Sequence, residues 1–104
     1  MVITITKDNF QTEVANSDKP VLIDFYADWC GPCKQLSPLV EEVSQTENDF
    51  KVCKVNVDQQ PEIASAFAVS SIPMLAIIKD GKITDTSIGA ISKDKLISFM
   101  HNNL

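Results

Sequence analysis

One short segment, Val21–Tyr26, restricts the folds open to this chain more than any other feature. It reads Val-Leu-Ile-Asp-Phe-Tyr, which is too short for a helix and apolar almost throughout. Such segments form strands that are covered on both faces, as in parallel sheets with helices on either side. Asp24 interrupts the apolar run, so we expect its carboxyl group to lie in the interior of the protein.

Strand and helix patterns alternate along the rest of the chain, in the order β-α-β-α-β-α-β-β-α. Besides Val21–Tyr26, strands are expected at Val2–Ile5, Phe50–Val57, Met74–Lys79 and Lys82–Ile88. Helices are expected from Thr6 to about Ala15, from near Cys30–Cys33 to about Gln45, from Pro61 to about Phe67, and after an N-cap at Ser92. Asp80-Gly81 predicts a two-residue hairpin. The pattern therefore predicts an α/β protein with a central mixed five-stranded sheet and four helices on its two faces.

Length and charge narrow the classes of function. The 104 residues, with no repeat or break in composition, predict a single domain over 1–104. No apolar run approaches the roughly 18 residues of a membrane span, and no secretory signal precedes the first strand, so we expect a cytoplasmic protein. The chain has fourteen acidic residues and nine basic ones, all lysines, which gives a net charge of −5. A negative chain without arginine repels nucleic acids and anionic membranes, so we exclude both as partners.

The segment Trp29-Cys30-Gly31-Pro32-Cys33-Lys34 carries the chemistry. It follows the buried strand at the start of a predicted helix, where the two sulfurs can meet across one turn. The helix N-terminus stabilises a thiolate, so Cys30 would be the attacking sulfur and Cys33, one turn further in, would resolve the mixed disulfide. Pro32 suits the first helical turn, and Gly31 lets a substrate backbone come close.

Two other interpretations of the cysteine pair stay open at this point. A C-x-x-C pair is also half of a zinc site, although only Cys53 and His101 remain as further ligands and neither has the spacing of a second half-site. The pair could also be two inert buried thiols. We expect Cys53 itself to pack as a small buried hydrophobe, with a regulatory thiol as the alternative.

The chain resembles the thioredoxin family, in its bacterial cytosolic form, over essentially its whole length. The resemblance is carried by the Trp-Cys-Gly-Pro-Cys-Lys segment after the buried strand, by Ile72-Pro73 as the cis-proline dipeptide, by the Lys79-Asp80-Gly81 hairpin and by Gly89. It implies the thioredoxin fold and a thiol–disulfide oxidoreductase that reduces protein disulfides. In that activity Cys30 attacks and Cys33 resolves. A redox-regulated binding module without turnover is the alternative function.

The resemblance also implies catalytic roles for two further residues. Asp24 would be the buried acid/base that handles the proton of Cys33, with Lys54 on the neighbouring strand as its charge partner. Desolvation supports this independently, because burial can raise the pKa of a carboxyl group by up to about 3–5 units. The alternatives are a purely structural Asp24 and an ordinary solvated Lys54.

Substrate binding and partners follow from the same resemblance. An apolar docking surface would surround the disulfide, and the backbone of Ile72 would pair with a substrate chain as an added strand. The residues of this docking surface are Trp29, Gly31, Pro32, Ile72, Pro73, Gly89 and Ala90. For Trp29 the alternative is a position in the core. The implied partners are a thioredoxin reductase and disulfide-containing substrate proteins, and the protein would be a monomer. No cofactor or metal is implied, because the electrons pass through the cysteines.

Two residues depart from the family pattern. Met74 follows the proline where the family most often has threonine. We expect its thioether to lie next to the active sulfurs, where it could alter substrate fit or add sensitivity to oxidation. Tyr26 occupies a position that holds a second tryptophan in some members.

Overall fold

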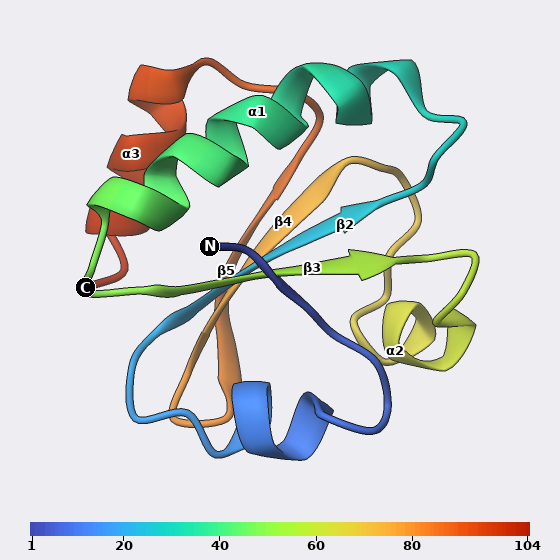
Figure 1. Cartoon of the computed structure of the whole chain (residues 1–104), viewed down its shortest axis with the longest axis horizontal. Coiled ribbons are helices and arrows are strands. Elements are labelled where there is room, and N and C mark those ends of the chain that lie inside the picture. Colours follow the sequence, from blue (N-terminus) through green and yellow to red (C-terminus); the bar gives the residue numbers. More distant parts are fainter.

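A five-stranded mixed sheet forms the centre of the computed structural model, which describes residues 1–104 (Figure 1). The strands are β1 (Ile3–Thr4), β2 (Val21–Tyr26), β3 (Lys51–Asn56), β4 (Met74–Lys79) and β5 (Lys82–Ile88). Their order across the sheet is β1-β3-β2-β4-β5. The first three are parallel to one another, while β4 and β5 run antiparallel to their neighbours. The predicted α/β class and its antiparallel edge are confirmed.

Four helices cover the two faces of this sheet. They are η1 (Gln11–Ala15), α1 (Gly31–Thr46), α2 (Pro61–Ala66) and α3 (Lys93–His101). Figure 1 shows α1 and α3 on one side of the sheet and η1 and α2 on the other. None of the helices has the length and hydrophobicity needed to cross a membrane.

The alternation of side chains along β2 divides the core into two clusters. Ile23 and Phe25 belong to the cluster beneath η1 and α2, whereas Leu22 belongs to the one beneath α1 and α3. Because both faces of β2 are covered, its residues are apolar almost without interruption. Asp24, two residues after Leu22, lies on the face that α1 and α3 cover.

The first helix differs from the prediction of an α-helix from Thr6 to about Ala15. Residues 7–9 form a turn, and the helix that follows is a π-helix over Gln11–Ala15. The Thr6 hydroxyl still caps the turn by accepting the Asp8 N–H at 3.2 Å. Asn9 explains the irregular start, because its side chain accepts the Thr6 N–H at 2.8 Å and donates to the Thr4 carbonyl at 2.9 Å. These local bonds compete with a regular first turn.

The last helix and the hairpin form as predicted. The Ser92 hydroxyl caps α3 by accepting the Lys95 N–H at 3.2 Å. Asp80 and Gly81 both have positive φ, +53° and +77°, as a two-residue hairpin of this kind requires.

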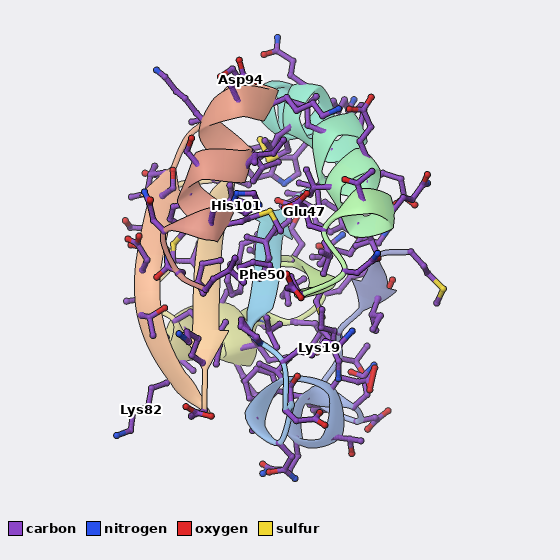
Figure 2. All side chains as sticks on the ribbon, turned by 90° about the vertical axis from the view of Figure 1, so that its left-hand side faces the viewer. Lys19, Glu47, Phe50, Lys82, Asp94 and His101 are labelled. Carbon is purple, nitrogen blue, oxygen red and sulfur yellow. A yellow bond between two sulfur atoms is a disulfide. The ribbon has the colours of Figure 1, made fainter.

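Two contacts between polar side chains join α3 to α1 and to the residue that follows α1. Lys93 lies 3.1 Å from Glu42, and His101 contacts Glu47 just after the end of α1. Figure 2 shows His101 on α3 beside Glu47.

Candidate active site

The two cysteines of the motif sit at the N-terminus of α1 and form a disulfide. Cys30 is the N-cap residue, Cys33 lies in the first turn, and their Cα atoms are 5.3 Å apart. The Cys33 N–H donates to the Cys30 sulfur at 3.2 Å. The start of the helix therefore brings both sulfurs together and directs a backbone donor at one of them.

The exposure of the whole residues does not distinguish the two cysteines, since Cys30 is 4% exposed and Cys33 is 3% exposed. Their positions in the helix do. Only Cys30 receives a free backbone N–H of the first turn, at the positive end of the helix dipole. This is the kind of contact that stabilises a thiolate.

Trp29, directly before the disulfide, is 71% exposed and is not a core residue. Its indole N–H donates to a carboxylate oxygen of Asp58 at 2.8 Å. Asp58 lies just after β3 and so ties the exposed ring to the loop that follows that strand. The indole is thus presented to solvent in a defined orientation.

The loop before β4 brings a second group of predicted site residues to the disulfide. The Ile72–Pro73 peptide bond is cis, and Ile72 packs against the small cluster formed by Ala27 and the two cysteines. The Gly89 N–H donates to the Pro73 carbonyl at 2.8 Å, which places the end of β5 beside this loop. Gly89 has a φ of +95°, a conformation that favours glycine.

The remaining predicted docking residues, Gly31, Pro32 and Ala90, are exposed. A Cβ atom on Gly31 would meet no other atom within 4 Å, so nothing inside the molecule requires a glycine there. The open space above Gly31 is available to a partner chain.

Two small cavities are lined by residues of the site and share no residue. One, of about 190 Å³, lies on the Trp29 side and is lined by Trp29, Val57, Ala64, Val69, Ser70, Ser71 and Ile72. The other, of about 170 Å³, touches Cys33 and is lined by Tyr26, Ala27, Asp28, Cys33, Lys34 and Ser37. Cys33 therefore has an opening of its own, apart from the Trp29 side. A larger cavity of about 300 Å³ lies between η1 and α2 and contains none of the predicted site residues.

Asp24 lies in the interior, as the sequence predicts, with an exposed fraction of 3%. Its Oδ1 atom has no hydrogen-bond partner. Burial raises the pKa of the Asp24 carboxyl group to about 7, and the positive charge of Lys54 acts in the opposite direction. A carboxyl group with this pKa can exchange a proton near neutral pH.

Lys54 lies opposite Asp24 in the register of β2 and β3 and is half-buried. The two side chains do not form a direct ion pair. The Lys54 ammonium instead lies over the ring of Tyr26, 5.9 Å from its centroid. Lys54 thus acts on Asp24 through space.

Met74 is not where the sequence suggested. It is buried and packs in the core cluster with Phe25 and Phe67, beneath η1 and α2, and not in the small cluster around the two sulfurs. Strand alternation is the reason: Met74 lies opposite Phe25 in the register of β2 and β4 and shares its face of the sheet. The expectation of a thioether beside the disulfide was wrong.

The other cysteine is a core residue. Cys53 is fully buried in the cluster that contains Met74, and burial raises the pKa of its thiol to about 12. It therefore behaves as the small hydrophobe that the sequence predicts. No group of three or more potential metal ligands lies together anywhere in the chain.

Two residues of the site were missed by the sequence reasoning. Asp58 holds Trp29, but the two are 29 positions apart and no local pattern marks a loop aspartate as an indole partner. Tyr26 shares a face of β2 with Asp24, so strand alternation could have placed its ring near Lys54.

Comparisons with known proteins agree with this geometry. The family model named Thioredoxin matches residues 1–102. The chain is 43% identical to thioredoxin of Rickettsia bellii, with both chains covered fully. It is 45% identical to thioredoxin 1 of Synechococcus elongatus. The matched region covers 96% of this chain and 94% of that relative. A thioredoxin of Acidithiobacillus ferridurans is 40% identical, with 99% and 96% covered.

These matches favour an oxidoreductase over a binding module without turnover. Members of the family act on disulfide substrates and are served by a reductase. The paired sulfurs at the start of α1 supply the redox group that such an activity requires. The chain belongs to the thioredoxin family and is a thiol–disulfide oxidoreductase that reduces protein disulfides.

Proposed function

We propose that Cys30 attacks the substrate disulfide and that Cys33 completes the reaction. The Cys30 thiolate displaces one substrate sulfur and forms a mixed disulfide. Cys33 then attacks the Cys30 sulfur, so that the second substrate thiol leaves and a Cys30–Cys33 disulfide forms. Two electrons pass to the substrate. The observation that carries this assignment is the backbone N–H of Cys33, which points at the sulfur of Cys30.

Asp24 takes the role of acid/base in this scheme. Cys33 must lose its proton before it can attack, and a carboxylate in the interior can accept that proton. Support comes from the burial of Asp24, from its unpartnered Oδ1 atom and from a pKa raised to about 7. Lys54 assists by lowering the cost of the carboxylate form.

Substrate proteins dock around the disulfide on the docking surface formed by Trp29, Gly31, Pro32, Ile72, Pro73, Gly89 and Ala90. The exposed indole of Trp29 and the open space above Gly31 support this surface. The backbone of Ile72 is the proposed pairing edge for an extended substrate segment. A thioredoxin reductase returns the disulfide to the dithiol. We place this monomeric protein in the cytoplasm, where thiols are kept reduced.

The two cysteines are tested with dithiothreitol-driven reduction of insulin disulfides. We expect rapid turnover by the wild type and background rates for both Cys30→Ser and Cys33→Ser. A separate incubation of each reduced variant with insulin, after dithiothreitol has been removed, separates their roles. In it Cys33→Ser should accumulate a mixed disulfide with substrate, visible as an added mass, while Cys30→Ser should not. Trapping by Cys30→Ser alone would reverse the assignment. No turnover by folded wild-type protein would contradict the reductase function.

The acid/base role of Asp24 is tested by the pH dependence of the same assay. Asp24→Asn removes the proton acceptor, so turnover should fall more at neutral pH than at high pH, where solvent base can deprotonate Cys33. An equal loss at every pH would leave Asp24 without a proton role.

A further inference from the structure

The Lys54 ammonium lies beside an aromatic ring and not beside a carboxylate. Its Nζ atom takes part in no ion pair with any carboxylate. It lies over the aromatic ring of Tyr26, within the range in which a cation is attracted to a ring face. Lys54 is a long, flexible side chain at a half-buried position, so a contact at its ammonium limits the positions that the charge can take.

The strand register places Tyr26, Lys54 and Asp24 on one face of the sheet. Asp24 and Tyr26 are two residues apart on β2, and Lys54 lies opposite Asp24 on β3. Tyr26 also lines the cavity that touches Cys33. The Tyr26 ring therefore contacts the lysine, shares a sheet face with the buried carboxyl group and lines the opening to the resolving sulfur.

We propose that Tyr26 is a positioning residue, whose ring holds the Lys54 ammonium facing Asp24 and thereby sets how readily the Asp24 carboxyl group releases its proton. The inference rests on the proposed acid/base role of Asp24. It assigns no chemistry to the tyrosine hydroxyl, because the ring face is the part that contacts the ammonium.

Lys54 is the charged group that lowers the pKa of Asp24 against the effect of burial. From β4 the register neighbour is the apolar Leu75, and from α1 the titratable side chains Cys33 and Lys34 line the cavity that Tyr26 also lines. In the oxidised protein Cys33 is bonded and does not titrate. The carboxyl group is thus governed by burial, which raises its pKa, and by Lys54, which lowers it.

These two influences give opposite results when the ring is removed. If Tyr26 holds Lys54, its loss lets the ammonium move into solvent, and the pKa of Asp24 rises. If the ring only shields the interior from water, its loss hydrates Asp24, and the pKa falls towards that of an ordinary aspartate. The sign of the change therefore separates positioning from simple shielding.

The experiment is a 13C NMR titration of the Asp24 carboxyl carbon in the oxidised protein. Tyr26→Leu should raise the pKa of Asp24 by about half a unit or more, which corresponds to moving one charge a few ångström away near a protein surface. Tyr26→Phe keeps the ring and should leave the pKa unchanged. Tyr26→Trp offers the strongest ring face and should give the lowest pKa of the series.

The same leucine substitution in a Lys54→Met background is the control. Without the ammonium there is nothing to position, so the upward shift should disappear. An unchanged or lowered pKa in Tyr26→Leu would overturn the inference, and so would an upward shift that persists in Lys54→Met. If the leucine variant does not fold, the pKa of Asp24 is compared among Tyr26→Trp, the wild type and Tyr26→Phe. A pKa that is no lower in Tyr26→Trp than in Tyr26→Phe would then overturn the inference.

This titration uses no substrate and is independent of turnover. The acid/base role of Asp24 fails in the pH dependence of Asp24→Asn, whereas the positioning role of Tyr26 fails in the NMR titration. Each of the two hypotheses can therefore be contradicted without affecting the other.

Discussion

At the scale of single residues, the burial of Asp24 makes the stability of the protein depend on pH. In the unfolded chain an aspartate ionises near 3.8, whereas in the fold the pKa of Asp24 is about 7. Between these values the unfolded chain has lost the proton that the folded protein keeps. Stability therefore falls as pH rises from about 4 to about 7, and the full penalty is present above that window.

Asp24→Asn should remove this penalty. At about pH 8 we expect the oxidised variant to be more stable than the wild type by on the order of 4 kcal/mol, the value of a three-unit shift of the pKa. Near pH 4 most of this advantage should vanish, because the wild-type carboxyl group is then neutral in the fold. Urea unfolding of both proteins at the two pH values measures the effect. If Asp24→Asn were more stable than the wild type by the same amount at both pH values, the charge of Asp24 would not be the cause of the difference.

The hydrogen bond between Trp29 and Asp58 makes a second prediction at this scale. Asp58→Ala frees an exposed indole, so the local motion of Trp29 should increase and the KM for a protein substrate should rise a few-fold. Asp58→Asn is the matched control, since its amide oxygen can still accept the indole N–H. Stability should change by less than about 1 kcal/mol, because the contact lies at the surface. Fluorescence anisotropy of the only tryptophan reports the motion directly.

Fluorescence anisotropy can also contradict the prediction for Asp58. If the indole of Asp58→Ala is no more mobile than that of Asp58→Asn, the hydrogen bond does not orient Trp29. A raised KM with unchanged anisotropy would point to a direct contact between Asp58 and the substrate.

Some of these residue positions could be predicted from sequence and others could not. The interior location of Asp24 follows from its place inside an apolar strand segment, and the buried state of Cys53 follows in the same way. Asp58 lies in a loop, and its contact with Trp29 exists only once β2 and β3 are paired. Met74 was misplaced because nearness in sequence to Pro73 was taken for nearness to the sulfurs, although alternation along β4 turns its side chain to the other face.

At the scale of elements, the hairpin between β4 and β5 depends on the conformation of its turn. Gly81 has a φ of +77°, and a Cβ atom added there would lie 3.4 Å from the carbonyl oxygen of Ala15. Gly81→Ala should therefore cost about 1–2 kcal/mol in the free energy of unfolding, chiefly from the left-handed backbone. Chemical unfolding measures this cost.

Asp80→Asn is the matched control for the turn, because asparagine adopts positive φ with little strain and should leave stability nearly unchanged. Turnover per folded molecule should stay at the wild-type value in both variants. The turn follows Lys79, whereas Met74 at the other end of β4 follows the site loop. A loss of activity without a loss of stability would show that the hairpin influences the site in some other way.

The elements themselves were predictable where the pattern is strong. The strand Val21–Tyr26, the cap at Ser92 and the Asp80-Gly81 turn each carry a local physical cause that no distant contact overrides. The π-helix η1 was not predictable, because Phe10 and Val14 have the spacing of an ordinary helix face. The local hydrogen bonds of the Asn9 side chain with Thr4 and Thr6 reshape its start, and the spacing of apolar residues does not reveal them.

At the scale of the whole molecule, two apolar clusters on opposite faces share the strands β2, β3 and β4. Ile23 contributes to the cluster beneath η1 and α2, and Ile77 to the one beneath α1 and α3. Neither cluster can lose its strands without exposing the other. The chain should therefore unfold in one cooperative transition, although its core is divided. Asp24, as a buried acid on one of these faces, lowers the stability of the entire unit and not of a local segment.

Conservative substitutions that open a small cavity on each face of the sheet test whether the two clusters unfold together. Ile23→Val and Ile77→Val should each cost about 0.5–1.5 kcal/mol, and the double variant should cost their sum to within about 0.5 kcal/mol, since the side chains lie on opposite sides of the sheet. Trp29 fluorescence and far-UV circular dichroism should report the same urea midpoint in every variant. A tryptophan transition that precedes the loss of secondary structure in Ile77→Val alone would mean that the α1 face, with the disulfide, opens as a separate unit. The active site would then sit on the less stable half of the molecule, because α1 carries both sulfurs and packs on the cluster that contains Ile77.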